Sequence, residues 1–311
     1  MDEYPRSMTE LETKFATEDA CRAYLYNLRW PNGFQCPKCC GDKAWPATDK
    51  LWTCQKCRHQ TSVIAGTIFE RTRQPLPVWF RAIWSVTTQK NGASALGLQR
   101  VLGISYKTAW TWLHKIRRAM VRPGRDKLRG TIEVDETYIG AIDEETHGRE
   151  PGKKVLIVVA AQWDGKRIGR IRMRKIPNAS ESNLLPFVQD FIESGSHVRT
   201  DGWSGYNGLS SAGYVHEVVI IGSNRKMATE LLPRVHLVVS LLKRWLLGTH
   251  QGAVSFEHLD YYLDEFCFRF NRRTSRSRGM LFYRLLQQAM AAEPVPYKRI
   301  ALGIKRYKPK G

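Results

Sequence analysis

The chain has 311 residues, with 49 Lys and Arg against 29 Asp and Glu, which gives a formal charge of +20 and a pI near 9.8. This charge calls for a polyanionic partner, and nucleic acid is a better candidate than an anionic membrane surface. The longest apolar run, at 155–163, is far shorter than the roughly 20 residues that a membrane-spanning helix needs.

The N-terminal sequence predicts a cytoplasmic protein. Residues 1–10 (MDEYPRSMTE) are acidic and lack the apolar core of a signal peptide. In that compartment the seven cysteines are expected to be reduced, which favours metal binding over disulfides.

Residues 1–32 are predicted to form a helical segment. Thr17 can cap the stretch EDACRAYLYNLRW, whose apolar residues recur at helical spacing. Cys21 is one of them, and we interpret it as a small core side chain.

Residues 33–66 are predicted to form a zinc ribbon. Cys36 and Cys39 make one C-x-x-C pair, Cys54 and Cys57 make another, and fourteen residues separate the two pairs. Four thiolates at this spacing can surround one structural Zn²⁺ tetrahedrally. Cys40 is an extra thiol beside the first pair and could compete as a ligand.

Residues 67–120 are predicted to hold a helix-turn-helix, with a turn at Gly103 and a second helix capped by Ser105. In a major groove the second helix would present Tyr106, Lys107, Thr108, Thr111, Lys115, Arg117 and Arg118. A helical hairpin without a DNA role is the alternative. The basic run that follows favours DNA, since only Asp126 is acidic between 115 and 129. Residues 121–130 are predicted to be a basic linker.

Residues 131–290 have the pattern of a mixed sheet covered by helices. Strands are expected near 131–141, 153–163, 166–176 and 197–203, and helices near 182–194 and 233–246. Residues 291–311 are predicted to be a basic tail that is partly disordered.

Carboxylates in two of these strands predict a second metal site. Asp135 lies in the first strand, with Glu133 on the same face and Glu136 on the other, and Asp201 ends a later strand. Two such carboxylates from adjacent strands can hold Mg²⁺ or Mn²⁺. His236, on the helix after these strands, is placed to be a third ligand. The alternatives are a turn-capping aspartate and a core histidine.

Together, several motifs resemble a known family. They are CPKC with CQKC, SVIAGTIFERTRQPL, GISYKTAWTWLHKIR, VDETYIG, RTDGWSGY, LLKRWLLGTHQG and YLDEFCFRFNRR, and they span essentially the whole chain. The chain resembles the ISXO2-like group of bacterial insertion-sequence transposases, which have an N-terminal zinc ribbon and a DDE-type catalytic domain with a ribonuclease-H-like fold.

The resemblance implies catalytic roles for Asp135 and Asp201, and for the residue seven positions before Lys243. That residue is His236, where many such enzymes carry Glu. A neutral imidazole binds Mn²⁺ more readily than Mg²⁺ and loses the bond when protonated, so we expect a steep acid limb. Glu230 and Glu265 are rival third acids.

The resemblance also implies contacts with DNA. Lys243 would touch a phosphate near the cleaved bond, and Trp203 and Tyr206 would either stack on a base or belong to the core. A run of arginines without acids favours phosphate contact over a solvated surface: Arg269, Arg272, Arg273, Arg276 and Arg278.

The implied function is metal-dependent cleavage at the ends of the element, followed by transfer of the 3′-hydroxyl into target DNA. Double-stranded DNA is the expected partner, both as terminal inverted repeats and as target, and two ends require a homodimer or a larger synaptic complex. One rival is an inactivated transposase or a regulator that binds DNA without chemistry. Another is a nuclease that cuts without joining.

Overall fold

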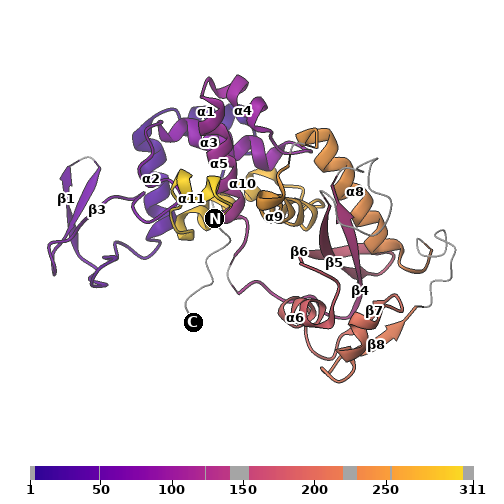
Figure 1. The fold of residues 1–311 in the computed structure, drawn as a ribbon. Coiled ribbons are helices and arrows are strands. Elements are labelled where there is room, and N and C mark those ends of the chain that lie inside the picture. Colours follow the sequence, from indigo (N-terminus) through magenta and orange to yellow (C-terminus); the bar gives the residue numbers. More distant parts are fainter. Residues whose placement is uncertain are drawn as a thin grey trace. The chain divides into compact units, whose positions relative to one another are not determined.

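The computed structural model describes residues 4–48, 50–122, 124–140, 154–219, 230–252 and 254–303 (Figure 1). By its contacts the chain forms two compact units. Unit 1 comprises residues 1–122 with 275–311, and unit 2 comprises residues 123–274.

Unit 1 is mainly helical. Its helices are α1 (Met8–Lys14), α2 (Glu18–Arg29), α3 (Leu76–Thr88), α4 (Ala95–Leu102), α5 (Tyr106–Ala119), α10 (Arg278–Ala291) and α11 (Tyr297–Ala301). Thr17 caps α2 by accepting a hydrogen bond from the backbone of Ala20, and Cys21 is fully buried, so both predictions for this segment are confirmed.

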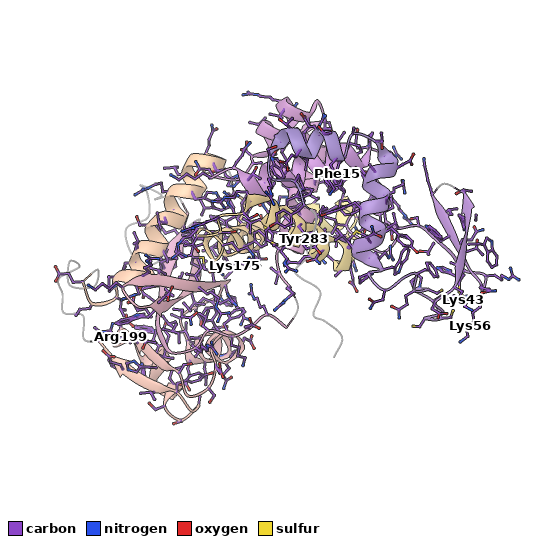
Figure 2. The ribbon with its side chains drawn as sticks, turned by 180° about the vertical axis from the view of Figure 1, so that it is seen from behind. Phe15, Lys43, Lys56, Lys175, Arg199 and Tyr283 are labelled. Atoms are coloured by element: carbon purple, nitrogen blue, oxygen red, sulfur yellow. The ribbon has the colours of Figure 1, made fainter. Side chains whose placement is uncertain are left out.

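The C-terminal helix α10 belongs to unit 1, whereas the sequence placed it at the end of the catalytic region. It packs against α2, α3 and α5. The ring of Phe282 lies 5.7 Å from that of Phe80 and 6.1 Å from that of Phe15, and the rings of Phe15 and Phe80 are 4.8 Å apart. Figure 2 labels Phe15, at the end of α1, and Tyr283, which follows Phe282 on α10. Because the buried aromatic side chains of α10 pack against α3, α10 belongs to the core of unit 1 although it is far from α3 in the sequence.

The helix-turn-helix geometry has the predicted form. Gly103 ends α4 in the left-handed conformation with φ of +65°, which suits glycine because it lacks a Cβ atom. The hydroxyl of Ser105 accepts a bond from the backbone of Thr108 and caps α5. The helix α11 packs on α5, so the predicted tail begins with ordered helix. Residues 304–311 lie outside the described residues.

The ribbon is a small antiparallel sheet in the order β1-β2-β3, with β1 at Ala44–Thr48, β2 at Leu51–Cys54 and β3 at Gln60–Thr61.

Unit 2 is built on a five-stranded mixed sheet in the order β6-β5-β4-β7-β8. The strands are β4 (Thr131–Ile139), β5 (Val155–Asp164), β6 (Arg167–Lys175), β7 (His197–Thr200) and β8 (Val215–Val218). β4, β5 and β6 are antiparallel neighbours, whereas β7 pairs parallel with both β4 and β8. This is the ribonuclease-H-like mixed sheet that the resemblance implies, and four of its strands are where the sequence predicts them.

Helices cover both faces of this sheet. α8 (Pro233–His250) and α9 (Leu259–Phe270) bury their apolar side chains on one face, and the short η2 (Phe256–His258) precedes α9. α6 (Glu181–Phe191) and η1 (Ser204–Leu209) cover the other face. Within the described ranges no helix combines the length and apolarity that a membrane crossing requires.

Residues 124–130 are part of unit 2, although the sequence suggested a linker. Leu128 is fully buried and pairs with Ile192 as an isolated bridge. The guanidinium of Arg172 donates to the carbonyl of Asp126 at 2.7 Å, and the ammonium of Lys127 donates to the carbonyl of Gln189. This segment therefore enters the domain before β4 begins.

Candidate active site

The pairing of β4 with β7 brings the two predicted aspartates together. Glu133 on β4 is opposite Arg199 on β7 in the parallel register, and Asp135 and Asp201 each lie two residues further along. Asp201 directly follows the last residue of β7. Carboxylate oxygens of Asp135, Glu136 and Asp201 all lie within 4.8 Å of one another.

Glu136 is the member of this cluster that the sequence did not assign. Alternation along β4 directs Asp135 towards α8 and Glu136 towards η1, where the hydroxyl of Tyr206 donates to Glu136 Oε2 at 2.7 Å. The two acids still approach each other through the backbone, since the N–H of Glu136 donates to Asp135 Oδ1 at 2.9 Å. In the sequence, the adjacent acids Asp135 and Glu136 were the signal from which a pair of metal ligands could have been predicted.

The cluster is electrostatically strained without a cation. Burial, followed by the charges of Glu136 and Asp201, raises the pKa of Asp135 from 3.8 to about 7. Burial also raises the pKa of Glu136, and Asp201 adds to this effect. Converging carboxylates of this kind match the hard oxygen ligands that Mg²⁺ and Mn²⁺ prefer.

His236 faces this cluster from α8. Its Nε2 lies 3.7 Å from Asp135 Oδ2, and this nitrogen is buried without a hydrogen-bond partner among the described residues. Burial lowers the pKa of His236 below 6.5, and Lys243 lowers it further although Glu133 opposes this. An orphaned, neutral imidazole nitrogen beside carboxylates fits a metal ligand.

Lys243 lies on the same side of α8 as His236. Its ammonium donates to the hydroxyl of Thr137, two residues after Asp135 on β4, at 3.3 Å and remains exposed. The rival acids lie elsewhere. Glu230 is exposed and precedes α8, and Glu265 is fully buried on α9, and neither belongs to the acidic cluster.

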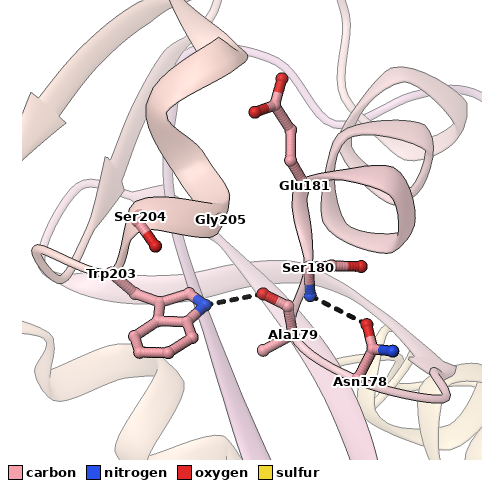
Figure 3. Close-up of a pocket in the computed structure, with 7 residues that line it drawn as sticks. All are labelled: Asn178, Ala179, Ser180, Glu181, Trp203, Ser204 and Gly205. Atoms are coloured by element: carbon pink, nitrogen blue, oxygen red, sulfur yellow. Dashed lines mark hydrogen bonds between the residues drawn. The ribbon is translucent and has the colours of Figure 1, made fainter.

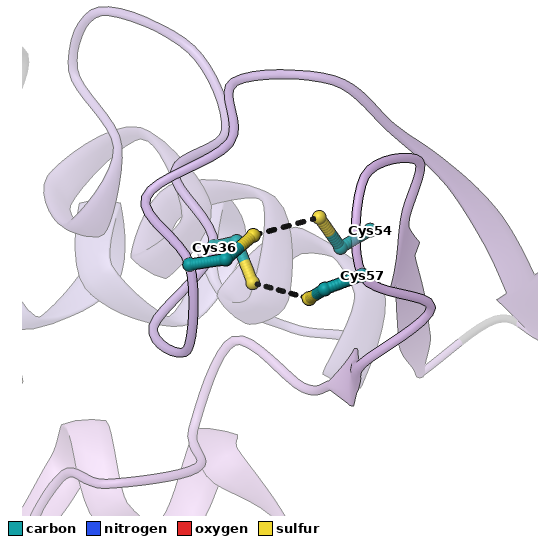
Figure 4. A group of neighbouring side chains, drawn as sticks. Cys36, Cys54 and Cys57 are labelled. Atoms are coloured by element: carbon teal, nitrogen blue, oxygen red, sulfur yellow. Dashed lines mark hydrogen bonds between the residues drawn. The ribbon is translucent and has the colours of Figure 1, made fainter.

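The four ribbon cysteines form a second cluster. Their sulfur atoms lie within 4.8 Å of one another, with 3.6 Å between Cys36 and Cys57 and 3.6 Å between Cys39 and Cys54 (Figure 4). A tetrahedron with Zn–S bonds of about 2.3 Å has S–S edges of roughly 3.7 Å, so the arrangement fits one zinc ion. Cys40 is exposed and lies outside the cluster.

Two family models match the chain. Residues 127–271 match the family model of the ISXO2-like transposase domain, and residues 16–60 match that of the transposase zinc-ribbon domain. The chain thus carries an ISXO2-like transposase domain preceded by a transposase zinc ribbon. An uncharacterized protein in transposable element ISH50 of Halobacterium salinarum is 26% identical over 277 residues, which is 82% of this transposase and 91% of that protein.

Solved structures show weaker similarity. A chain of the simian T-cell lymphotropic virus intasome, in complex with PP2A regulatory subunit B56 gamma, is 16% identical with a TM-score of 0.32, covering 68% of this transposase and 75% of that chain. The Mos1 strand transfer complex is 15% identical with a TM-score of 0.29, covering 74% of this transposase and 79% of that chain.

The residues predicted to contact DNA from α5 fall into two groups. On the outer side of the helix, Tyr106 and Lys107 are exposed, and the others are half-buried: Thr108, Thr111 and Arg118. Arg117, by contrast, is only 1% exposed, and the ammonium of Lys115 donates to the backbone carbonyl of Ile68 at 3.2 Å. The prediction is therefore corrected for Arg117, whose position on α5 faces the core of unit 1, whereas Lys115 is half-buried and its DNA contact remains a prediction.

The arginines after α9 are likewise engaged within the transposase. The guanidinium of Arg273 donates to the carbonyls of Ile168 and Phe270, and that of Arg272 donates to the carbonyl of Phe268 at 3.2 Å. Arg269 is half-buried. These contacts hold the edge of β6 and the end of α9, while Arg273 stays exposed, so the phosphate role of Arg272 and Arg273 remains a prediction from the sequence.

A shallow pocket of about 470 Å³ is lined by residues 178–181 and 203–205, and the second of these segments begins two residues after Asp201 (Figure 3). Its wall includes Trp203, which is 48% exposed and donates from its indole nitrogen to the carbonyl of Ala179 at 2.6 Å. Only glycine fits at position 205, because a Cβ there would lie 2.4 Å from the same carbonyl. Tyr206 is 1% exposed and belongs to the core, so of these two predicted rings it is Trp203 that can be offered to a base.

Proposed function

We propose that this chain is an active transposase, which cleaves DNA at the ends of its insertion sequence and transfers the new 3′-hydroxyl into target DNA. The observation that carries the proposal is the convergence of the Asp135, Glu136 and Asp201 carboxylates, with the orphaned nitrogen of His236 lying 3.7 Å from Asp135. An inactivated protein has no need to keep a buried, unpaired imidazole nitrogen beside the half-buried carboxylate of Asp135, because burying unsatisfied polar groups is costly.

We assign Asp135, Asp201 and His236 as ligands of Mg²⁺ or Mn²⁺. Bound there, the ion would lower the pKa of the attacking hydroxyl and neutralise the leaving oxygen. Glu136 lies close enough to contribute a further oxygen, and the hydroxyl of Tyr206 fixes its orientation. Water is the nucleophile in the first step and the 3′-hydroxyl in the second, and each step exchanges one P–O bond for another.

Other parts of the chain would bind and orient DNA. The exposed ammonium of Lys243 contacts a phosphate near the scissile bond as a point charge. Trp203 supplies a stacking surface for a base next to that phosphate. The zinc ribbon and the outer side of α5 bind the terminal inverted repeats. Two ends must be joined together, so the protein acts as a dimer or larger synaptic complex, in the bacterial cytoplasm at the nucleoid.

The test is a joining assay with oligonucleotides that carry the terminal repeats of the encoding element and a supercoiled plasmid as target. Wild type is expected to join them when Mn²⁺ is present, and Asp135→Ala is expected to reduce joining by at least a thousandfold. The control is Asp164→Ala, which removes an exposed aspartate at the end of β5 and should retain full activity.

Each other outcome identifies a rival function. If wild type and Asp135→Ala are equally inert with Mn²⁺ but both bind the terminal repeats, the chain is a DNA-binding protein without chemistry. Cutting without joining, and without preference for the terminal repeats, would instead identify a nuclease.

A further inference from the structure

Glu133 makes an unusual set of contacts for a carboxylate in a central strand. It is fully buried and accepts four hydrogen bonds. Its Oε2 receives the backbone N–H groups of Arg234 at 2.7 Å and Val235 at 2.9 Å, and its Oε1 receives the side chains of Arg234 at 3.2 Å and Trp163 at 3.0 Å. Each oxygen of this buried charge is thus paired with two donors.

The two backbone donors are the first N–H groups of α8. Pro233, the first residue of the helix, has no N–H, and Leu232 at the N-cap provides no side-chain acceptor. The next N–H, that of His236, already bonds to the carbonyl of Leu232 at 3.3 Å. The cap of α8 therefore comes from β4, because the helix has no cap of its own.

The guanidinium of Arg234 strengthens this junction. It lies 3.7 Å from the ring centre of Trp163 on β5, and its second nitrogen donates to the carbonyl of Gly165 at 3.1 Å. The start of α8 is consequently fixed to two adjacent strands, β4 and β5.

From this junction, β4 and α8 run alongside each other towards the candidate metal site. Glu133, Asp135 and Thr137 occupy alternate positions on one face of β4. Glu133 holds the first turn of α8, Asp135 lies 3.7 Å from His236 one residue further, and Thr137 receives the ammonium of Lys243 two turns later. Because a helix is nearly rigid over such a distance, the cap sets where the imidazole lies.

We propose that Glu133 is a positioning residue, which sets the axial position and rotation of α8 so that the imidazole of His236 lies beside Asp135. The inference rests on the proposed function in one respect: the Asp135 carboxylate and the His236 imidazole must bind the same divalent ion. Partners that orient metal ligands typically change metal affinity 10–100-fold when they are removed.

The experiment uses full-length, zinc-loaded protein at one fixed pH near 8, with Mn²⁺ as the probe. Mn²⁺ affinity is measured by water proton relaxation. Proximity is measured by paramagnetic broadening of the His236 imidazole signals in histidine-labelled protein, assigned with His236→Asn. Glu133→Asp keeps the charge but shortens the reach, and Glu133→Gln keeps the reach but loses the charge. Both should weaken Mn²⁺ binding about tenfold or more and reduce the broadening.

Two further variants keep the test decisive. Trp163→Phe removes one of the four donors and keeps a ring for Arg234, so it should fold and weaken Mn²⁺ binding about threefold. Glu217→Gln is the matched control, because it breaks a half-buried ion pair with Arg199 in the same sheet and should leave Mn²⁺ binding unchanged.

A purely structural cap would give a different result. The Glu133 variants would then unfold at lower temperature but bind Mn²⁺ within twofold of wild type and retain the broadening of His236, which would overturn the inference. Absence of broadening in wild type would overturn it as well. If wild type shows the broadening but neither cuts nor joins DNA, the proposed function fails and the positioning role stands.

Discussion

The raised pKa of Asp135 predicts that the acidic cluster destabilises unit 2 when Mg²⁺ and Mn²⁺ are absent. Its folded-state pKa of about 7 lies above the ordinary value of 3.8, so folding favours the protonated acid. The stability associated with that proton is fully present below pH 3.8 and is lost as the pH rises through about 7. Between pH 5 and pH 8 the loss amounts to about 2.5 kcal/mol.

Replacing Asp135 with Asn should abolish this dependence, because the amide resembles the protonated acid and cannot ionise. Wild type should therefore lose about 2.5 kcal/mol more than Asp135→Asn between pH 5 and pH 8. Asp164→Asn is the control and should behave as wild type. Saturating Mn²⁺ should recover the stability of wild type at pH 8, since a ligand of the folded state stabilises it.

The measurement is urea unfolding of zinc-loaded, full-length protein in buffers free of other divalent ions. Met173, buried on β6, reports on unit 2 through its protection from oxidation by peroxide. If wild type and Asp135→Asn show the same change in unfolding free energy between the two pH values, within 0.5 kcal/mol or so of each other, then burial and charge repulsion do not act on this carboxylate as argued.

Three further outcomes are expected. Cys54→Ser should lose the zinc of the ribbon, measured by metal analysis, but keep Mn²⁺ binding in unit 2; loss of both would show that the two sites are not independent. Lys243→Ala should slow single-turnover joining on the order of 100-fold with little change in binding of the terminal repeats, since a charge near the scissile phosphate acts mainly in the transition state. Arg273→Ala should cost about 0.5–1.5 kcal/mol in urea unfolding, because the carbonyls of Ile168 and Phe270 exchange this exposed donor for water. The DNA affinity of Arg273→Ala should depend on salt concentration as that of wild type does. A weaker dependence on salt would show that Arg273 contacts a DNA phosphate.

The structure leads to a different prediction for the residue whose protonation lowers activity at acid pH. The sequence assigns it to protonation of His236, but burial lowers the pKa of this imidazole while it raises that of Asp135 to about 7. In the metal-free protein, Asp135 is therefore the first of these two ligands to be protonated as the pH falls. Activity measured against pH with Asp135 intact and His236→Asn should retain its acid limb; disappearance of the limb would assign it to the imidazole.

The sequence alone was enough to predict the local features of this protein. The cap of α2 at Thr17, the turn at Gly103, the two C-x-x-C pairs and the positions of β4 to β7 depend on residues that are near neighbours in the chain. The pairing of Asp135 with Asp201 was also inferred correctly, because it needs only adjacent strands and their alternation. The short β8 gave no comparable pattern.

Tertiary structure decided what depends on distant partners. The inclusion of Glu136 in the acidic cluster and the capping of α8 by Glu133 follow from how strand and helix pack, which local periodicity does not encode. The same holds for charge: Arg117 looks like a surface cation in the sequence but is buried in unit 1. A charged side chain can contact DNA only if it is not already bonded to an acceptor within the protein. Which acceptors lie near it depends on the tertiary structure and cannot be read from the local sequence.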